Sequence, residues 1–233
     1  FPHERALVNF FKRWVARWIY KIAGRRVDSL LSVSPKGLKR LQKLIPHAQK
    51  ANFIPLMSES TLEVNNFELK CKNKNIRFIY VGDHSLPRKL EVVLKAIVRA
   101  INNGLLAEFK FIGGEPQDIK RLLNVYGVEK LKKKGILKFI QKIPRKYLWN
   151  EFMDSDVGLS LIPPDEHYIE ASPTKLSEYM RAGLAVLASN GIELQEEFVK
   201  KSSGGVLCDW NEDDIVKSLI DLSINKAQLK NLK

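Results

Sequence analysis

A short polar cluster in the second half of the chain carries residue types that bind an anion and a polyhydroxyl ligand. Thr174, Lys175 and Glu178 share one face of a predicted helix, because successive residues lie about 100° apart around the axis. Ser172 has the character of an N-cap, and Pro173 that of a first helical residue. The unpaired N–H groups of a helix start, its positive dipole end and a lysine together favour an anion. Glu178, one turn further on, has the chemistry to accept hydrogen bonds from a pair of sugar hydroxyls.

The same residues have an ordinary alternative. Lys175 and Glu178 are three positions apart, so they could form a solvated ion pair worth about 0.2–0.5 kcal/mol. The opposite face of the helix carries a stripe with the spacing of a buried surface: Leu176, Tyr179, Met180 and Gly183. Gly183 also suits the left-handed residue that closes a helix. Spacing alone leaves the ligand site and the surface ion pair open.

Strand-like and helical segments alternate from Ile76 onward. Strands are predicted at 77–81, 108–112, 136–140, 157–162, 185–189 and 205–208. Helices are predicted at about 87–102, from 116, and at 145–153, 172–183 and 212–222. This alternation implies an α/β fold with a doubly wound parallel sheet and right-handed crossovers. Ligands of such sheets bind at the carboxyl ends of the strands, where the chain places Gly82, Gly113-Gly114 and the Ser172 helix start.

The segment from Ser172 to Gly183, preceded by Glu170, resembles the donor-site signature of the retaining glycosyltransferases of family 4, which have the GT-B fold. In that family two glutamates separated by seven residues flank the start of this helix, as Glu170 and Glu178 do here. The resemblance implies that Glu178 holds the ribose hydroxyls of a nucleoside-diphosphate sugar and that Glu170, the candidate catalytic residue, contacts the transferred sugar. It also implies donor contacts from the start of the helix: Ser172, Thr174 and Lys175.

The resemblance extends to the loop after the first strand, Gly82 to Lys89. In the family an arginine follows this glycine, and a lysine about six residues later completes a cationic clamp on the donor diphosphate. Lys89 stands at the lysine position, whereas Asp83 occupies the arginine position and would repel phosphate. Arg88 is expected to replace the missing charge, because a guanidinium suits phosphate oxygens. The alternative is that Arg88 and Lys89 are solvated residues in the first turn of a helix.

Two further positions follow from the resemblance. Ile143, in the turn Gln141-Lys-Ile-Pro144, is the candidate for a nucleobase contact. Gly114 is expected on the donor side of the sheet. The segments Tyr147–Trp149 and Asp154–Asp156 resemble structural segments of the family.

The first part of the chain is basic and amphipathic. Residues 1–57 hold 12 lysines and arginines against two acidic residues, and therefore carry +10 of the formal net charge of +13. Residues 4–23 read as a helix with a wide apolar face that includes Trp14 and Trp18, which is typical of an interfacial membrane anchor. The alternative is a helix whose apolar face packs inside its own domain. Charge alone leaves an anionic membrane, nucleic acid or a polyanionic substrate open.

The order of elements before residue 58 resembles the last third of an acceptor-binding N-terminal domain. A buried strand is predicted at 28–35, a helix from Ser34-Pro35 to about Leu44, and an apolar run at 52–57. The expected domains are therefore 1–57, the end of the acceptor domain, and 76–233, the nucleotide-sugar-binding domain, joined by a linker at 58–75. Since the sequence begins at Phe1, we expect it to be part of a longer protein.

Other classes of protein lack their marks in this sequence. Gly82-Asp-His-Ser-Leu-Pro does not supply the glycine fingerprint of nicotinamide-binding folds, and no Walker lysine loop exists. The four histidines have no metal-ligand spacing, so neither a metal nor another cofactor is expected. A sugar-nucleotide epimerase of the same architecture remains the enzyme alternative, and a basic module that binds nucleic acid or membrane is the non-enzyme alternative, with nucleic acid unfavoured for want of a motif.

The expected setting follows from these features. No run of 18 apolar residues exists, and Cys71 and Cys208 read as reduced thiols of a cytosolic protein. The expected partners are a nucleotide-sugar donor and a saccharide or lipid-linked acceptor, in surface polysaccharide or glycolipid synthesis. The expected location is the cytoplasm, and residues 1–57 leave open a peripheral position on the inner face of an anionic membrane.

Overall fold

The computed structural model describes residues 2–56 and 75–224, which form two compact units. The first unit comprises the residues up to Leu56 together with Glu170–Ser172, and the second comprises the other described residues. The predicted linker at 58–75 lies, apart from its last residue, outside the described residues.

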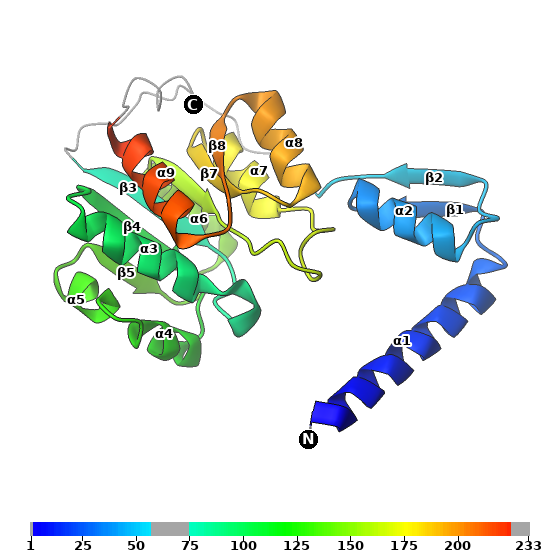
Figure 1. Ribbon diagram of the computed structural model, residues 1–233. Coiled ribbons are helices and arrows are strands. Elements are labelled where there is room, and N and C mark those ends of the chain that lie inside the picture. The colour runs from blue at the N-terminus through cyan, green and yellow to red at the C-terminus, as the bar shows by residue number, and fades with distance from the viewer. Residues whose placement is uncertain (1, 57–74, 225–233) are drawn as a thin grey trace. The chain divides into compact units, whose positions relative to one another are not determined.

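Six parallel strands form the sheet of the second unit, in the order β5-β4-β3-β6-β7-β8 (Figure 1). They are β3 (Ile76–Val81), β4 (Ala107–Ile112), β5 (Leu137–Ile140), β6 (Val157–Ser160), β7 (Ala185–Ser189) and β8 (Gly205–Cys208). The first strand of the unit is thus central, and the direction of strand addition reverses between β3 and β6, as in a Rossmann-like fold. The predicted doubly wound α/β fold is confirmed.

Helices bury both faces of this sheet, which is why its strands are nearly continuous apolar runs. One core lies under α3 (Leu90–Asn102), α4 (Pro116–Leu123), α5 (Val128–Lys133) and α9 (Glu212–Ile224). The other lies under α6 (Arg145–Met153), α7 (Thr174–Arg181) and α8 (Glu193–Ser202). Successive residues of β3 alternate between the cores, with Phe78 in the first and Ile79 in the second. Figure 1 shows α3 and α9 packed side by side.

Tyr179 anchors α7 to the sheet. Its ring is fully buried over Gly158 of β6, where an added Cβ would lie 2.3 Å from a ring carbon. Its hydroxyl oxygen accepts a hydrogen bond from the N–H of Val81 at 2.7 Å, at the carboxyl end of β3. Burial raises the pKa of Tyr179 above its ordinary value, so the hydroxyl stays neutral. The buried stripe predicted for this helix is confirmed at Leu176 and Tyr179, and Gly183 has the predicted left-handed backbone, with φ 70°.

The helix predicted from Pro87 to Asn102 is wrong at its start. A short 3₁₀ turn, η1 (Leu86–Arg88), comes first, and Lys89 then adopts a left-handed backbone with φ 48° before α3 begins. The break leaves Leu86 exposed while Leu90 is fully buried in the core. The break therefore separates the exposed turn from the helix, which begins at the buried residue Leu90.

The role predicted for Ser172 as an N-cap is also wrong. Helix α7 begins at Thr174 with Pro173 as its N-cap, and no side chain caps it. The Ser172 hydroxyl oxygen instead accepts a hydrogen bond from the N–H of Leu56 at 2.8 Å, within the first unit. A long-range backbone partner has replaced the local one.

The first unit contains α1 (Pro2–Gly24), β1 (Ser29–Ser32), α2 (Pro35–Leu44) and β2 (Lys50–Phe53). Strands β1 and β2 pair in parallel, and the Ser34 hydroxyl caps α2 by accepting a hydrogen bond from the N–H of Gly37 at 3.1 Å. The helix predicted from Ser34-Pro35 is therefore confirmed. The strand predicted at 28–35 is present but not buried as a whole: Leu30 is buried, whereas Leu31 is 62% exposed.

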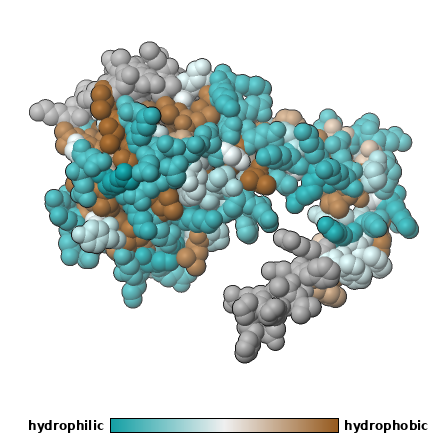
Figure 2. Space-filling view, in the orientation of Figure 1, coloured by the Kyte–Doolittle hydropathy of each residue, from teal (hydrophilic) through white to brown (hydrophobic). Residues whose placement is uncertain are grey.

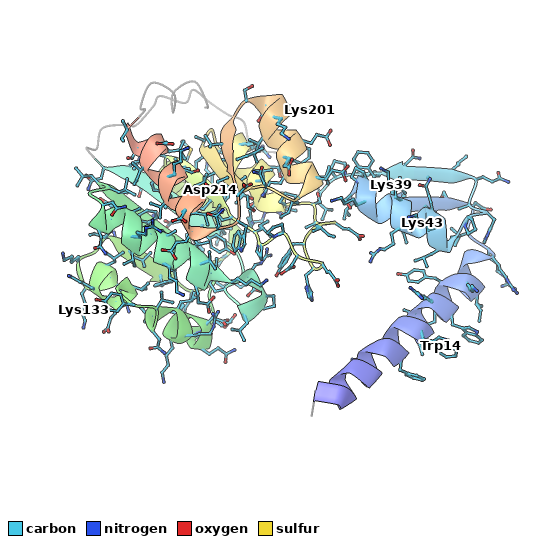
Figure 3. The ribbon with its side chains drawn as sticks, in the orientation of Figure 1. Trp14, Lys39, Lys43, Lys133, Lys201 and Asp214 are labelled. Carbon is cyan, nitrogen blue, oxygen red and sulfur yellow. The ribbon has the colours of Figure 1, made fainter. Side chains whose placement is uncertain are left out.

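Helix α1 exposes large apolar side chains beside basic ones. Trp14 and Trp18 are 56% and 57% exposed, and Trp14 projects from the helix in Figure 3. Lys12, Arg17 and Lys21 are exposed on the same helix. On the face of the second unit seen in Figure 2, hydrophilic residues predominate with hydrophobic ones between them. Among the described residues, no helix is long and apolar enough to cross a membrane.

Cys208 closes β8 as a buried free thiol. Burial raises the pKa of this thiol to about 12, and the nearby carboxylates of Asp214 and Asp209 act in the same direction. Cys71 lies outside the described residues.

Candidate functional site

A pocket of about 410 Å³ opens at the carboxyl ends of β3 and β4. Its apolar lining residues are Val81, Ile112, Ile143 and Leu148. Charged residues contribute to the same lining: Asp83, Glu115, Lys142, Arg145 and Lys175. An apolar floor with a few charged groups, in a volume of this size, fits a small polar molecule that carries a flat apolar part.

Two glycines bring the strand ends together at this pocket. The N–H of Gly82 donates to the carbonyl of Ile112 at 2.9 Å and so continues the β3–β4 pairing beyond the strands. Gly113 has φ 113°, and a Cβ there would lie 2.5 Å from the Gly82 carbonyl oxygen. The loops after β3 and β4 can therefore approach each other this closely only because glycine stands at position 113.

Cationic side chains surround one carboxylate at the start of α7. Glu178 pairs with Lys175 at 2.7 Å and lies 3.8 Å from the Arg145 guanidinium. The Glu178 side chain is only 11% exposed, so this is not the solvated surface pair that spacing allowed. Lys142 forms no hydrogen bond or ion pair with any residue in the described part of the chain. The lining therefore carries three cations beside the carboxylates of Asp83 and Glu115, and Lys142 has no carboxylate partner among the described residues.

Asp83 turns its carboxylate toward the loop itself. The carboxylate accepts a hydrogen bond from the N–H of Ser85 at 3.0 Å and another from the Ser85 hydroxyl. Burial alone would raise the pKa of Asp83, but the two hydrogen bonds together with the charge of Arg88 outweigh it and hold the pKa below its ordinary value. Asp83 therefore stays ionised with both oxygens partly satisfied.

His84, the next residue, is fully buried beside the pocket. Its Nδ1 lies 2.8 Å from the Gly82 carbonyl oxygen, so Nδ1 carries the proton and donates it. Its Nε2 is buried with no hydrogen-bond partner in the described part of the chain. Burial lowers the pKa of His84, against the opposing effect of the Gly82 hydrogen bond and of the Asp83 and Asp118 charges, so the ring is neutral near pH 7.

Arg88 and Lys89 follow the same loop in sequence and are not among the residues that line the pocket. The Arg88 guanidinium carbon lies 4.6 Å from the centre of the Tyr168 ring, and its Nε is buried without a hydrogen-bond partner among the described residues. Lys89 pairs with Asp165 at 3.2 Å. The structure thus brings these two cations together with the 163–169 loop rather than with Lys175.

The remaining predicted site residues are distributed between the two units. Glu170 belongs to the first unit, where its carboxylate pairs with Arg40 at 2.8 Å. Ser172 belongs there too, in contact with Leu56. Thr174 begins α7 in the second unit, and its carbonyl accepts a hydrogen bond from the Ser177 hydroxyl at 2.8 Å.

Gly114 is buried, and a Cβ there would lie 2.8 Å from two carbons of the His84 ring. Of the predicted donor residues, the pocket unites Gly82, Ile143 and Lys175, and Glu178 is paired with Lys175.

Sequence reasoning missed several lining residues. Lys142 and Arg145 flank Ile143-Pro144, and two basic residues on either side of a turn already placed at the nucleobase were a usable signal. Glu115 gave no such signal, since an acidic residue before Pro116 is an ordinary helix start. His84 had no usable signal either, because its importance comes from burial. Within residues 2–56 and 75–224, no group of three or more His, Cys, Asp or Glu side chains is arranged to hold a metal ion.

The doubly wound sheet, with a pocket at its carboxyl edge, defines a Rossmann-like domain. Residues 63–233 match the family of glycosyl transferases group 1, and the chain belongs to this family. A search of curated protein sequences found no match.

Solved glycosyltransferases share the fold. Sucrose-phosphate synthase from Thermosynechococcus elongatus is 18% identical with a TM-score of 0.65, over 94% of this chain and 54% of that one. A TarM variant from S. aureus is 11% identical with a TM-score of 0.65, over 93% of this chain and 41% of that one. The pneumococcal O-GlcNAc transferase GtfA is 14% identical with a TM-score of 0.64, over 92% and 43%. The chain therefore spans about half the length of these proteins and shares their GT-B architecture.

Proposed function

We propose that this chain supplies the donor-binding part of a glycosyltransferase that moves a sugar from a nucleoside-diphosphate sugar to an acceptor hydroxyl with retention. The observation that carries this proposal is the pocket that joins an apolar floor, at Ile143 and Leu148, to the cations Lys142, Arg145 and Lys175. A nucleobase has a flat apolar face, and a diphosphate needs positive charge, so the two parts of the pocket match the two parts of the donor.

Each of these residues would have a role in the proposed transfer. Lys175 and the N–H groups at the start of α7 would stabilise the negative charge that develops on the departing diphosphate. Glu178, already held by Lys175 and Arg145, would accept hydrogen bonds from the ribose hydroxyls. Glu170 would contact the transferred sugar. Because side-chain cations supply the charge, the proposed reaction needs no metal, and the activity of the whole protein should survive chelation.

Related structures support the choice of ligand. The TarM variant was solved with UDP, and GtfA with UDP and GlcNAc. A uridine nucleotide is therefore the first donor to test, beside GDP- and ADP-sugars.

Calorimetry or saturation-transfer NMR with UDP-, GDP- and ADP-sugars tests the proposal. One of them should bind, and Glu178→Ala should weaken it by about 1–3 kcal/mol, the cost of losing a charged hydrogen bond. Glu197→Ala is a matched control, because Glu197 pairs with Lys201 on the surface of α8, within the same unit. Absence of binding by the whole set, or equal effects of the two substitutions, would refute the assignment.

For the first unit we propose reversible docking of α1 on an anionic membrane, at the inner face of the cell membrane. Exposed Trp14 and Trp18 supply aromatic side chains suited to the interface, and Lys12, Arg17 and Lys21 supply the opposite charge to anionic lipid. Docking would bring the enzyme to a lipid-linked acceptor in surface polysaccharide or glycolipid synthesis. The alternative acceptor is a free saccharide.

A further inference from the structure

The loop from Gly82 to Ser85 is held through its carbonyl groups. The Gly82 carbonyl accepts from Nδ1 of His84, and the Asp83 carbonyl accepts from the Tyr80 hydroxyl at 2.9 Å. The carbonyls of His84 and Ser85 accept from the Arg121 guanidinium and from the N–H of Arg88. Four successive carbonyls thus have partners, and the orientation of each peptide plane is fixed.

Fixed carbonyls determine where the N–H groups point. In a trans peptide the C=O and the following N–H are antiparallel, so the N–H groups of Asp83 and His84 point away from the His84 ring and the Tyr80 hydroxyl. Neither N–H has a partner among the described residues. The loop borders the pocket through Gly82 and Asp83. Successive backbone N–H groups that have no partner within the chain can form an anion-binding concavity.

The His84 ring is packed tightly enough to keep this orientation. Ring contacts of 5.5–6.2 Å between centroids surround it, from Tyr80, Phe111 and Phe139. Gly114 also borders the ring: a Cβ there would lie 2.8 Å from two imidazole carbons and 3.0 Å from Cγ1 of Ile119. Because the ring fills the space that a side chain at position 114 would need, the absence of a side chain at Gly114 has a steric explanation that involves no ligand.

We propose that His84 is a positioning residue for the donor diphosphate. By holding the Gly82 carbonyl, it presents the N–H groups of Asp83 and His84 to the phosphate oxygens, and Gly114 contributes by making room for the imidazole rather than by touching the ligand. The inference rests on the proposed function. It also explains how Asp83 is tolerated at a position facing phosphate, since its carboxylate is turned back to Ser85 while its N–H points the other way.

Two substitutions separate the hydrogen bond from the ring. His84→Phe keeps an aromatic ring without a donor, whereas His84→Asn keeps an amide N–H near the position of Nδ1. Calorimetry compares the binding of UDP with that of uridine, or of the diphosphate and nucleoside of the base that the wild type prefers. His84→Phe should weaken binding of the diphosphate about tenfold, the usual contribution of one hydrogen bond. It should leave the nucleoside unchanged, and His84→Asn should recover most of the loss. A loss shared equally by diphosphate and nucleoside, or no recovery with Asn, would overturn the proposal.

A double-mutant cycle tests the role of Gly114 independently. Gly114→Ala should weaken UDP binding in the wild type but have a much smaller further effect together with His84→Ala. The 2.8 Å contacts with the ring are then gone, and only the 3.0 Å contact with Cγ1 of Ile119 remains, which that side chain relieves by a small shift. Additive effects would show that Gly114 acts on the ligand directly and would refute the steric role. Thermal unfolding of each variant controls for folding, and if His84→Ala does not fold, the Phe and Asn pair decides. If the wild type binds no nucleoside diphosphate, the proposed function itself fails, which is a different result from additivity.

Discussion

Individual side chains at the carboxyl edge of the sheet are held by partners within the chain. Glu178 is shared by Lys175 and Arg145, and the Asp83 carboxylate is held by Ser85. Groups that are already oriented lose little freedom when a ligand arrives, so more of their interaction energy appears as affinity. The conformational entropy of these side chains is lost when the chain folds.

The buried hydrogen bond between Tyr179 and Val81 gives a test of stability at single-atom scale. Tyr179→Phe removes one hydroxyl and leaves the buried N–H of Val81 without an acceptor, so the free energy of unfolding should fall by about 1–3 kcal/mol. Urea denaturation measures it. Tyr126→Phe removes the same hydroxyl from a side chain that is 92% exposed and should change stability by less than about 0.5 kcal/mol. Equal effects would contradict the anchoring role of Tyr179.

The lowered pKa of His84 allows us to predict how the stability of the fold depends on pH. Its pKa is lowered in the folded chain, so the unfolded chain binds a proton first as pH falls below the ordinary value of 6.5. Asp83, Asp118 and Arg121 are the charged groups that act on the ring, and their effects do not overcome burial. The free energy of unfolding should therefore be highest above pH 6.5 and decrease toward pH 5, with a slope of at most about 1.4 kcal/mol per pH unit.

Urea denaturation of the wild type and His84→Asn between pH 5 and 8 measures this slope. The Asn variant cannot titrate and should lose that part of the pH dependence. Asp83 contributes in a separate window, since its pKa is lowered from 3.8 and its stabilisation is lost only at more acidic pH. An unchanged slope in the variant would show that another group titrates in this range.

At the scale of elements, local pattern was sufficient where burial is periodic and insufficient where it depends on distant partners. The six strands were predicted because helices bury both of their faces, which leaves long apolar runs. Helix α5 was missed because it has six residues and is held by burial of Val128 and Leu131 rather than by its own propensity. Helix α8 was missed because its buried face includes a polar residue, Gln195, whose partners are on β6 and β7.

The same division explains which site residues could be predicted. Gly82, Ile143 and Lys175 follow strands or open a helix, so their common edge is a consequence of topology alone. Ser172 was assigned a local cap, but its partner Leu56 is 116 positions away in sequence. The left-handed backbone of Lys89 also has no local signal, because a lysine rarely adopts it.

The left-handed backbone of Lys89 predicts that glycine has opposite effects on stability at Lys89 and at Lys95. Lys89→Gly should stabilise the chain by about 1 kcal/mol, because glycine adopts φ 48° without strain. Lys95→Gly, on the exposed face of α3, should destabilise it by about 1 kcal/mol, the usual cost of glycine inside a helix. Thermal or urea unfolding gives both values. A loss of stability at both positions would contradict strain at Lys89.

For the molecule as a whole, charge is distributed unequally, since residues 1–57 carry +10 and the rest +3. Attraction to an anionic leaflet contributes on the order of 1 kcal/mol per basic residue and weakens with salt. Arg17→Glu with Lys21→Glu should therefore reduce flotation with anionic vesicles, by at least about 2 kcal/mol in binding free energy.

The matched control changes the same charge in the second unit, with Lys132→Glu and Lys133→Glu on α5, where Figure 3 shows Lys133. It should float like the wild type at low salt, and neutral vesicles should bind none of the proteins. Equal losses in both variants would indicate non-specific attraction by net charge, and no flotation of the wild type would exclude membrane docking.

The buried thiol at the end of β8 has a consequence for experiments on the whole chain. At neutral pH a thiol whose pKa is about 12 is almost never a thiolate, and the thiolate is the form that alkylating reagents attack. In a Cys71→Ser background, maleimide should therefore modify Cys208 only as fast as the second unit opens. Mass spectrometry after brief exposure would then give the fraction of Cys208 that is modified. That fraction reports the rate at which the folded sheet opens.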